Sequence, residues 1–523
     1  MKRIFLLSTL IVIITFVSTS QITHDSTIVE TNESVYSAKE IKGVVLDSDK
    51  QTPLPYANIF VLNKNKGAIS NEKGHFSIDI TGLDNDDTIR FQYIGYSTRK
   101  LTIGELDTIL VVYLKEEIFN LSETIIFGNA LNARSIVKKV LQFKDSNYRK
   151  VTSNSLTFIR DRNTNIIEDV QLNLKKSTIT QLDKEMIEFV ENAIPRESIS
   201  YNDFMGNIYH SGNPDDSITQ KTDAIRIVSL KEKDIAELDQ IETIFEDVFN
   251  NIGDEEYWKV KSGIFSQKID DENESKNDTI NENIEPEKDT LKESGRKLVS
   301  INRAIQYRTR YSLMNDKDSW EFLHKTGKYN YTLAGGTRVN GEDVYIIDFT
   351  PKSSGKFIGR IYISMSTYAL VRADYEFDKD KLGRDFHMFG IGYTENQFSG
   401  SIYFEKKGDN YVLKYYSKKT GFSASIQRDF SLIKKRERFL FDKKLNEIKV
   451  GIDISMNQEE SVEYLVLDRT EISQEQFSDF TQKERMEIIY VDQFDDSLWK
   501  GFAIIEPTEQ MREYKKQKVD YTK

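Results

Sequence analysis

The 523-residue chain contains no cysteine. Disulfide bonds, catalytic thiols and cysteine metal ligands are therefore excluded, and so is the lipid-bearing cysteine that anchors bacterial lipoproteins. Histidine is also scarce, and its five copies stand apart at His24, His75, His210, His324 and His387. None of them lies in a His-x-x-Glu or His-Glu-x-x-His pattern, so the sequence predicts no metal site and no cofactor.

Other patterns that carry chemistry are missing as well. The chain has no Gly-x-Ser-x-Gly elbow, no phosphate-binding Gly-Lys-Ser/Thr loop and no dinucleotide fingerprint. Carboxylates are abundant in a chain that is 30% charged, so no two of them can be selected as an acid and base pair. We therefore predict no catalytic residue.

Basic residues are outnumbered, with 72 Lys and Arg against 84 Asp and Glu, which gives a net charge of -12. Phosphate backbones bind basic surfaces, so this balance argues against a nucleic-acid partner. Proline is rare, with seven copies, whereas 26 Tyr and 30 Phe favour sheet over helix. The length indicates two or three domains.

The N-terminus has the features of an export signal. Lys2 and Arg3 precede an apolar run at 4–17, and small residues follow at 18–20. A retained membrane anchor is the alternative, but this run is short for a bilayer span. We predict a signal peptide at 1–20, a flexible leader at 21–40 and an exported protein with no transmembrane span in the mature chain. It would act in the periplasm or at the periplasmic face of the outer membrane.

Short apolar runs alternate with turn residues between 41 and 127. This pattern predicts a small β-sandwich. Gly67 and Gly74 suit turn positions with positive φ. Five strands are expected, at Val44–Leu46, Asn58–Leu62, His75–Ile80, Thr88–Tyr93 and Ile109–Leu114, with a closing strand at Leu121–Ile126.

Three segments of this region carry a family resemblance: Pro53–Ile59, Gly67–Phe76 and Tyr93–Tyr96. Their order resembles the carboxypeptidase-like regulatory domain, found in secreted bacterial proteins and outer-membrane nutrient receptors. The resemblance implies a transthyretin-like sandwich and a place in the envelope, but no reaction. In zinc carboxypeptidases the related domain follows a catalytic domain, whose zinc pattern this chain lacks.

Two helices are expected after the sandwich. A connecting helix is predicted at 128–150 from the apolar residues Ile136, Val140, Leu141 and Phe143. Lys231–Phe249 is amphipathic, and it either packs across a sheet or forms a lid over an apolar cavity. An acidic tract at 270–295 is predicted to be disordered, because 270–293 alone has a net charge of -7.

The remaining chain, 151–510, is predicted to be one β-rich domain, and 511–523 a frayed tail. Apolar and polar residues alternate in Leu370–Phe377 and again in Glu447–Met456, so each strand should have one dry and one wet face. Ser473 and Gln476 can form a capping box. The predicted fold class is mainly β: a transthyretin-like sandwich followed by a large curved antiparallel sheet, a half-barrel, with a few packed helices.

The strands of this domain resemble the half-barrel of Lol-type lipoprotein carriers, in which helices plug a sheet that binds acyl chains. A wide sheet with a dry face must curl over its own helices or over a ligand, and both alternatives stay open. The candidate apolar groove consists of Tyr345, Ile347, Phe349, Val371, Ala373, Tyr375, Phe377, Ile448, Val450 and Ile452.

The function expected from these features is that of a non-enzymatic cell-envelope protein that docks or binds. Its partner would be an outer-membrane or envelope protein, or a lipid or other amphiphile. The alternative is an envelope hydrolase with an unrecognised carboxylate site, which would show converging carboxylates with a raised pKa in a pocket.

Overall fold

A computed structural model describes residues 40–64, 66–106, 109–119, 132–230, 255–263, 265–269, 296–483, 485–500, 502 and 504–514. The predicted signal peptide, the closing strand at Leu121–Ile126, the helix at Lys231–Phe249 and the acidic tract at 270–295 lie outside these residues. Within them, no helix has both the length and the apolar character needed to span a membrane.

The N-terminal part forms two small sheets with the strand orders β4-β1-β7 and β3-β2-β5-β6. Their side chains share one core, which includes Val45, Ile59, Phe76 and Phe91. This confirms the predicted sandwich. The elements are β1 (Glu40–Asp47), β2 (Asn58–Val61), β3 (Gly67–Ile69), β4 (His75–Asp79), β5 (Thr88–Gln92), β6 (Arg99–Thr102), η1 (Ile103–Glu105) and β7 (Ile109–Leu114).

The two glycines of the sandwich differ in what they do. Gly74 has a φ of 75°, and its N–H donates to the Asn71 carbonyl oxygen, so the turn predicted there is confirmed. The turn predicted at Gly67 is wrong, because this residue lies in β3. A Cβ at Gly67 would lie 2.9 Å from the Ile59 carbonyl oxygen, so glycine is needed there for the close approach of two strands.

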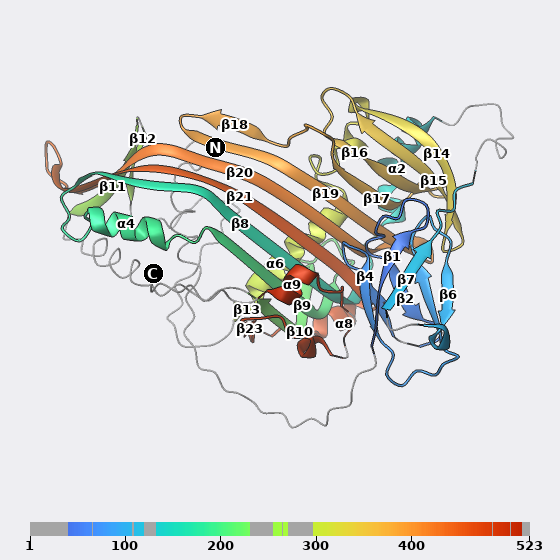
Figure 1. Cartoon of the computed structure of the whole chain (residues 1–523). Coiled ribbons are helices and arrows are strands. Elements are labelled where there is room, and N and C mark those ends of the chain that lie inside the picture. The colour runs from blue at the N-terminus through green and yellow to red at the C-terminus, as the bar shows by residue number, and fades with distance from the viewer. Residues whose placement is uncertain are drawn as a thin grey trace.

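One large open sheet dominates the remaining chain, with the order β14-β15-β16-β17-β19-β20-β21-β8-β9-β10-β23. All these neighbours are antiparallel except β10 and β23. The predicted curved antiparallel sheet is therefore confirmed (Figure 1). Its strands are β8 (Ser153–Ser177), β9 (Glu197–His210), β10 (Gln220–Leu230), β14 (Tyr329–Val339), β15 (Glu342–Pro351), β16 (Phe357–Ser364), β17 (Leu370–Phe377), β19 (Ile391–Lys407), β20 (Asn410–Arg436), β21 (Lys443–Glu471) and β23 (Ile489–Val491).

Short strands extend the edges of this sheet, and helices pack around it. The additional strands are β11 (Glu256–Ser262), β12 (Phe265–Ile269) and β18 (Asp385–Met388), with β13 (Arg296–Lys297) and β22 (Arg485–Met486) forming a separate pair. The helices are α2 (Ala133–Gln142), α3 (Lys144–Asn147), α4 (Lys184–Ala193), α6 (Leu298–Arg310), η3 (Tyr311–Leu313), α7 (Glu321–His324), η4 (Thr326–Lys328), α8 (Gln474–Asp479), η5 (Asp496–Trp499) and α9 (Glu509–Glu513).

Two helix predictions are confirmed in part or in full. The connecting helix is present as α2 followed by α3, and its residues Ile136 and Val140 are buried, while Phe143 is exposed. The capping box of Ser473 and Gln476 is formed at the start of α8. This capping box satisfies backbone N–H groups that the first helical turn leaves without a partner.

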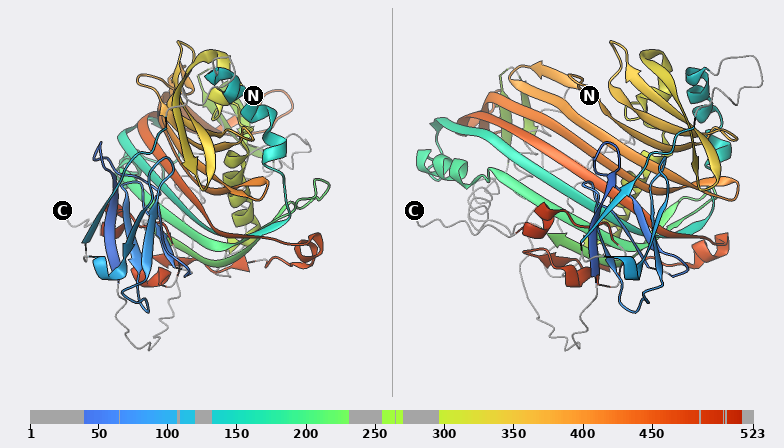
Figure 2. Two further views of the ribbon diagram at one scale, coloured as in Figure 1. Left: turned by 90° about the vertical axis from the view of Figure 1, so that its right-hand side faces the viewer. Right: turned by 45° about the vertical axis from the view of Figure 1, so that its right-hand side comes forward.

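The large sheet is covered on both faces near its sandwich end. Its inner face packs on α2, α6 and α7, and its outer face packs on the sandwich and the C-terminal segment around Trp499 and Ile505. Neighbouring residues of β8 show the division, since Phe158 belongs to the outer core and Ile159 to the inner core. Figure 2 shows the sandwich and α6 on opposite sides of the sheet.

This double cover corrects one prediction. Leu370–Phe377 does form β17, but its supposed wet face is not wet at Leu370 and Arg372, which are buried. Arg372 is only 6% exposed because its guanidinium lies 4.2 Å from the ring centroid of Tyr93 in the sandwich. The sequence of β17 alone contains no information about this second cover.

The inner core yields a stability prediction. Phe322 is fully buried, stacks on Phe349 with ring centroids 4.4 Å apart and meets the edge of Tyr375. We expect Phe322→Ala to lower the free energy of unfolding by about 3–5 kcal/mol, because it leaves a cavity among rings that cannot close it. Urea denaturation measures the change. Phe386→Ala, at a position 37% exposed, is the control and should cost less than about 1 kcal/mol; equal losses would contradict the assignment of Phe322 to the core.

Candidate functional site

The sandwich is attached to the outer face of the sheet by aromatic and main-chain contacts. Tyr56 follows the Pro53–Leu54–Pro55 segment with a φ of 63°, and its ring lies 4.3 Å from the ring of Tyr415 on β20. At the other end of the sandwich, Phe119 exchanges two backbone hydrogen bonds with Gly336 of β14. The two parts are therefore joined at more than one place.

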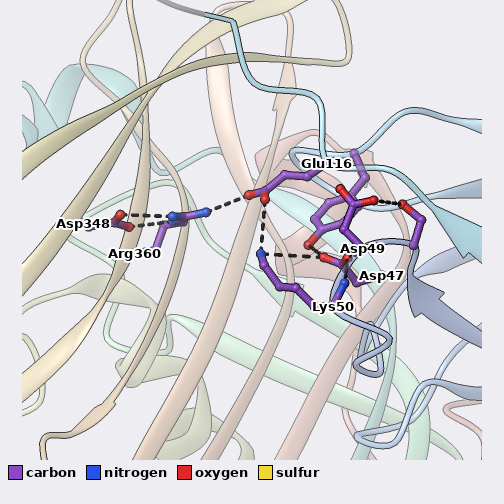
Figure 3. A network of polar contacts seen from close by, with 8 residues as sticks. Asp47, Asp49, Lys50, Glu116, Asp348 and Arg360 are labelled. Carbon is purple, nitrogen blue, oxygen red and sulfur yellow. Dashed lines mark hydrogen bonds and ion pairs between the residues drawn. The ribbon is translucent and has the colours of Figure 1, made fainter.

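A chain of charges adds a polar connection (Figure 3). Arg360 of β16 binds Asp348 through Nε at 2.6 Å and the sandwich residue Glu116 through Nη1 at 2.8 Å. Glu116 also accepts a hydrogen bond of 3.2 Å from Lys50, whose Nζ is 3.7 Å from Asp47. Such a network fixes orientation more than it adds stability, because most of its members are partly exposed.

Beneath the C-terminal segment, three charged residues form a row across three strands. Glu463 on β21 lies opposite Arg160 on β8, which lies opposite Asp203 on β9. Arg160 donates from Nε and Nη2 to the two carboxylate oxygens of Asp203 at 2.8 and 2.7 Å, and from Nη1 to the Ile505 carbonyl oxygen at 3.0 Å. The side chains of Arg160 and Asp203 are 5% and 2% exposed. We call Glu463, Arg160 and Asp203 the junction row.

A small cavity adjoins the junction row where the sandwich, the sheet and the C-terminal segment meet. Its volume is about 20 Å³, enough for about one water molecule. It is lined by Glu72, Arg160, Arg162, Tyr201, Ser461, Glu463, Thr508 and Met511. Burial raises the pKa of Glu463 to about 7, with Arg160 opposing the shift and Glu72 adding to it.

A second charged cluster lies on the inner face, under α6. Arg308 binds Asp161 through Nε at 3.2 Å and Glu460 through Nη1 at 2.7 Å. Burial raises the pKa of Asp161 to about 6, and Arg308 opposes that shift. Asp161 and Glu463 point to opposite faces of the sheet, because the strand partner of Glu463 is Arg160, the neighbour of Asp161. Asp161 and Glu463 therefore do not form an acid and base pair on one bond.

The structure divides the predicted groove residues between two places. Tyr345, Ile347, Phe349, Val371, Ala373 and Tyr375 are buried in the inner core, and Phe377 packs against it. Ile448 and Val450 belong to a separate cluster beneath α4, together with Ile187 and Trp258. Ile452, the next residue on that face of β21, is half-buried. At the first place the chain's own helices meet the sheet, through residues such as Trp320 and Phe322.

The junction row was not among the sequence predictions, although one signal for it exists. Leu156, Phe158 and Arg160 alternate along β8 and so share a face, and the first two contribute to the outer core. A charge in line with apolar residues indicates a buried ion pair. Its partners could not be identified, because Asp203 and Glu463 lie far along the chain. For metals, the described part of the chain has no group of three or more His, Asp or Glu residues arranged to hold an ion.

Comparison with known proteins identifies one domain. Residues 41–126 match the family model of the CarboxypepD_reg-like domain. The predicted resemblance of the sandwich is thereby confirmed. The match covers only this domain, so it does not assign the whole chain to a family. No curated protein matches the chain.

Several solved structures resemble the chain at low identity. A LolA superfamily protein from Nitrosomonas europaea has 10% identity, a TM-score of 0.15, and coverage of 66% of this chain and 95% of its own. A putative outer membrane lipoprotein-sorting protein domain from Vibrio parahaemolyticus has 9% identity, a TM-score of 0.18, and coverage of 66% and 97%. The MucA/MucB complex of Pseudomonas aeruginosa has 7% identity, a TM-score of 0.16, and coverage of 62% of this chain and 94% of its own. TM-scores this low carry no argument about function.

The buried ion pair of the junction row should be important for stability. Asp203→Ala leaves the Arg160 guanidinium buried without its carboxylate, and we expect the free energy of unfolding to fall by about 3–5 kcal/mol. Urea denaturation measures this. The matched control is Asp429→Ala, which removes a carboxylate that is 36% exposed and pairs with Lys175 and Lys449, and should cost less than about 1 kcal/mol. Similar losses in the two variants would refute the special position of Asp203.

The pKa of Glu463 makes stability depend on pH. The folded protein holds this proton up to about pH 7, whereas the unfolded chain releases it near the usual value of 4.5. The free energy of unfolding should therefore decrease as pH rises between these values, by up to about 1.4 kcal/mol per pH unit. Denaturation of the wild type and Glu463→Gln across this range measures the difference, since the variant lacks this proton.

Asp161→Asn provides the companion variant for the pH measurement. This variant should lack a separate decrease in the free energy of unfolding, which the wild type shows as pH rises from the usual carboxyl value of 3.8 to about 6. If Glu463→Gln has the same pH profile as the wild type, the raised pKa of Glu463 is wrong.

Proposed function

We propose that the protein is a non-catalytic binding protein of the bacterial cell envelope, exported to the periplasm or the periplasmic face of the outer membrane. The export signal in residues 1–20 and the regulatory-like domain at 41–126 support the location. The sandwich and the sheet act in this proposal as one body, because aromatic, main-chain and ionic contacts join them.

The junction row carries the non-catalytic part of the proposal. Arg160 is committed to Asp203 by two hydrogen bonds, and the cavity beside Glu463 holds about one water molecule. A glycan or peptide substrate needs a far larger space. The cluster is therefore suited to joining the sandwich, the sheet and the C-terminal segment, and it is poorly suited to turnover.

For the ligand, we propose an amphiphile that contacts the apolar face of β21 near Ile452. This residue lies next to the stretch with Ile448 and Val450, which α4 covers, and it is only half-buried. The residues alternate with polar ones such as Asp453, so one face of the strand is apolar and the other polar. An acyl chain can lie along such a face, while a purely polar ligand gains nothing from it.

A hydrolase remains the second candidate, because two carboxyl groups have pKa values near neutrality. A carboxylic acid with a pKa near 7 can donate a proton to a leaving group. Glu463 has such a pKa, and Asp161 comes close to it. Their location on opposite faces of the sheet counts against a shared reaction.

Native mass spectrometry of the protein isolated from its envelope tests the proposal. We expect a mass that includes one lipid-sized ligand, and we expect Ile452→Asn to release it. Asp453→Asn, on the opposite face of the same strand, is the control and should retain the ligand. A ligand-free wild type removes the amphiphile from the proposal. Release of products from envelope glycan or peptide that stops in Glu463→Gln would replace the whole proposal with the hydrolase.

A further inference from the structure

The turn between β20 and β21 exposes three consecutive apolar residues. Phe439, Leu440 and Phe441 are 101%, 78% and 86% exposed. The next most exposed large apolar residue of the described chain, Phe389, is 63% exposed. Single exposed apolar side chains are common on protein surfaces, but a run of three at full exposure is not. We call residues 437–442 the hairpin tip.

The point at which strand pairing ends explains why the hairpin tip is exposed. β20 and β21 pair as far as Arg436 and Lys443, and the neighbouring strand β11 also reaches Arg436, through Glu256. The chain turns beyond these last pairs, so the tip extends past the edge of the sheet. Figure 1 shows this turn at the end of the sheet farthest from the sandwich. The paired strands beneath it do not need the three side chains for their own packing.

The surroundings of the hairpin tip are basic in a protein with a net charge of -12. Residues 434–444 contain six basic and two acidic side chains. The two acidic ones have partners: Glu437 binds Lys268 at 2.7 Å, and Asp442 accepts a hydrogen bond from Tyr257. Among the basic ones, Lys434 and Arg436 pair with Glu256, and Lys444 pairs with Glu447. Arg438, Lys443 and Lys444 flank the apolar residues and are exposed. The tip thus combines an apolar point, formed by Phe439, Leu440 and Phe441, with a positive collar, formed by Arg438, Lys443 and Lys444.

We propose that the hairpin tip docks on an anionic lipid surface. The apolar point would enter the boundary between headgroups and acyl chains, while the positive collar stays at the level of the lipid phosphates. Aromatic side chains and long basic ones are the types that settle at this interface. A protein partner would need a cavity shaped for a convex point, whereas a lipid surface deforms around it. The charge complementarity and the convex shape together favour lipid.

The length of the strands determines how far the sandwich would lie from a lipid surface that holds the hairpin tip. Tyr415, which contacts the sandwich through Tyr56, lies on the same strand as Arg436 and roughly 70 Å from it along an extended backbone. A protein held by its tip would therefore keep the sandwich well away from the lipid surface. This proposal goes beyond the binding function above and does not depend on any ligand near Ile452.

Vesicle co-sedimentation tests the docking. The chain from Gln21 onward is used, so that the apolar run at 4–17 does not bind lipid itself. Vesicles of phosphatidylcholine with phosphatidylglycerol should bind the protein, and vesicles of phosphatidylcholine alone should bind it more weakly. Replacing Phe439, Leu440 and Phe441 by serine should lower the partition coefficient by about 100-fold.

Two further variants test whether binding depends on the basic residues and whether it depends on the hairpin tip itself. Arg438→Gln, Lys443→Gln and Lys444→Gln together should reduce the preference for anionic vesicles by about 100-fold. Phe389→Ser, at the exposed turn after β18, is the matched control and should bind like the wild type. The serine variant should retain the wild-type thermal unfolding temperature, because its three replaced residues lie beyond the last strand pair.

Leu440→Trp gives a direct measure of insertion. The three native tryptophans are Trp258, Trp320 and Trp499, each at most 4% exposed, so their emission should not respond to lipid. A blue shift on adding anionic vesicles supports the proposal. It is overturned if the wild type binds neither vesicle type, if the serine variant binds as well as the wild type, or if the tip variants lose a protein partner while vesicle binding is absent.

Discussion

Both faces of the large sheet carry apolar residues near the sandwich, and keeping both faces from water requires two separate covers. Helices α2, α6 and α7 form one cover, and the sandwich with the C-terminal segment forms the other. The exposure of apolar surface to water is the largest cost that the fold avoids. The position of the sandwich follows from this requirement, as does the burial of Arg372 under the sandwich and of Arg160 under the C-terminal segment.

Burying these two arginines has a consequence for the chemistry of the junction. Arg160 is held by Asp203 and the Ile505 carbonyl oxygen, and Arg372 by Asp374 and the Tyr93 ring. A buried guanidinium without such partners would be strongly unfavourable. The charged residues at the boundary between sandwich and sheet are thereby occupied with holding the two parts in one arrangement. The carboxyl groups with raised pKa values are by-products of the same burial, since Glu463 and Asp161 are raised mainly by the loss of water.

At the opposite end of the long strands, apolar side chains are not covered by other parts of the chain that the structure describes. There the sheet ends in the hairpin tip, whose three apolar side chains are exposed to water and whose flanks are basic. A surface of this kind becomes favourable once a lipid boundary removes its apolar part from water and neutralises its charge. At the sandwich end of the sheet, other parts of the chain cover the apolar side chains, whereas at the hairpin tip three apolar side chains are exposed.

The sequence by itself determined the local features of this protein. Five strands of the sandwich (β1, β2, β4, β5 and β7), the turn at Gly74, the capping box at Ser473 and the alternation in β17 and β21 follow from neighbouring residues, because periodicity and turn chemistry act over a few positions. Only the tertiary structure decided what covers each face. The partners of Arg160 lie on two other strands, and Arg372, on the face of β17 predicted to be wet, is buried because Tyr93 reaches it from a domain far earlier in the chain. Contacts between distant segments leave no periodic signal in a single sequence, so the junction row could not be derived from it, and the choice between helices and a ligand over the predicted groove stayed open.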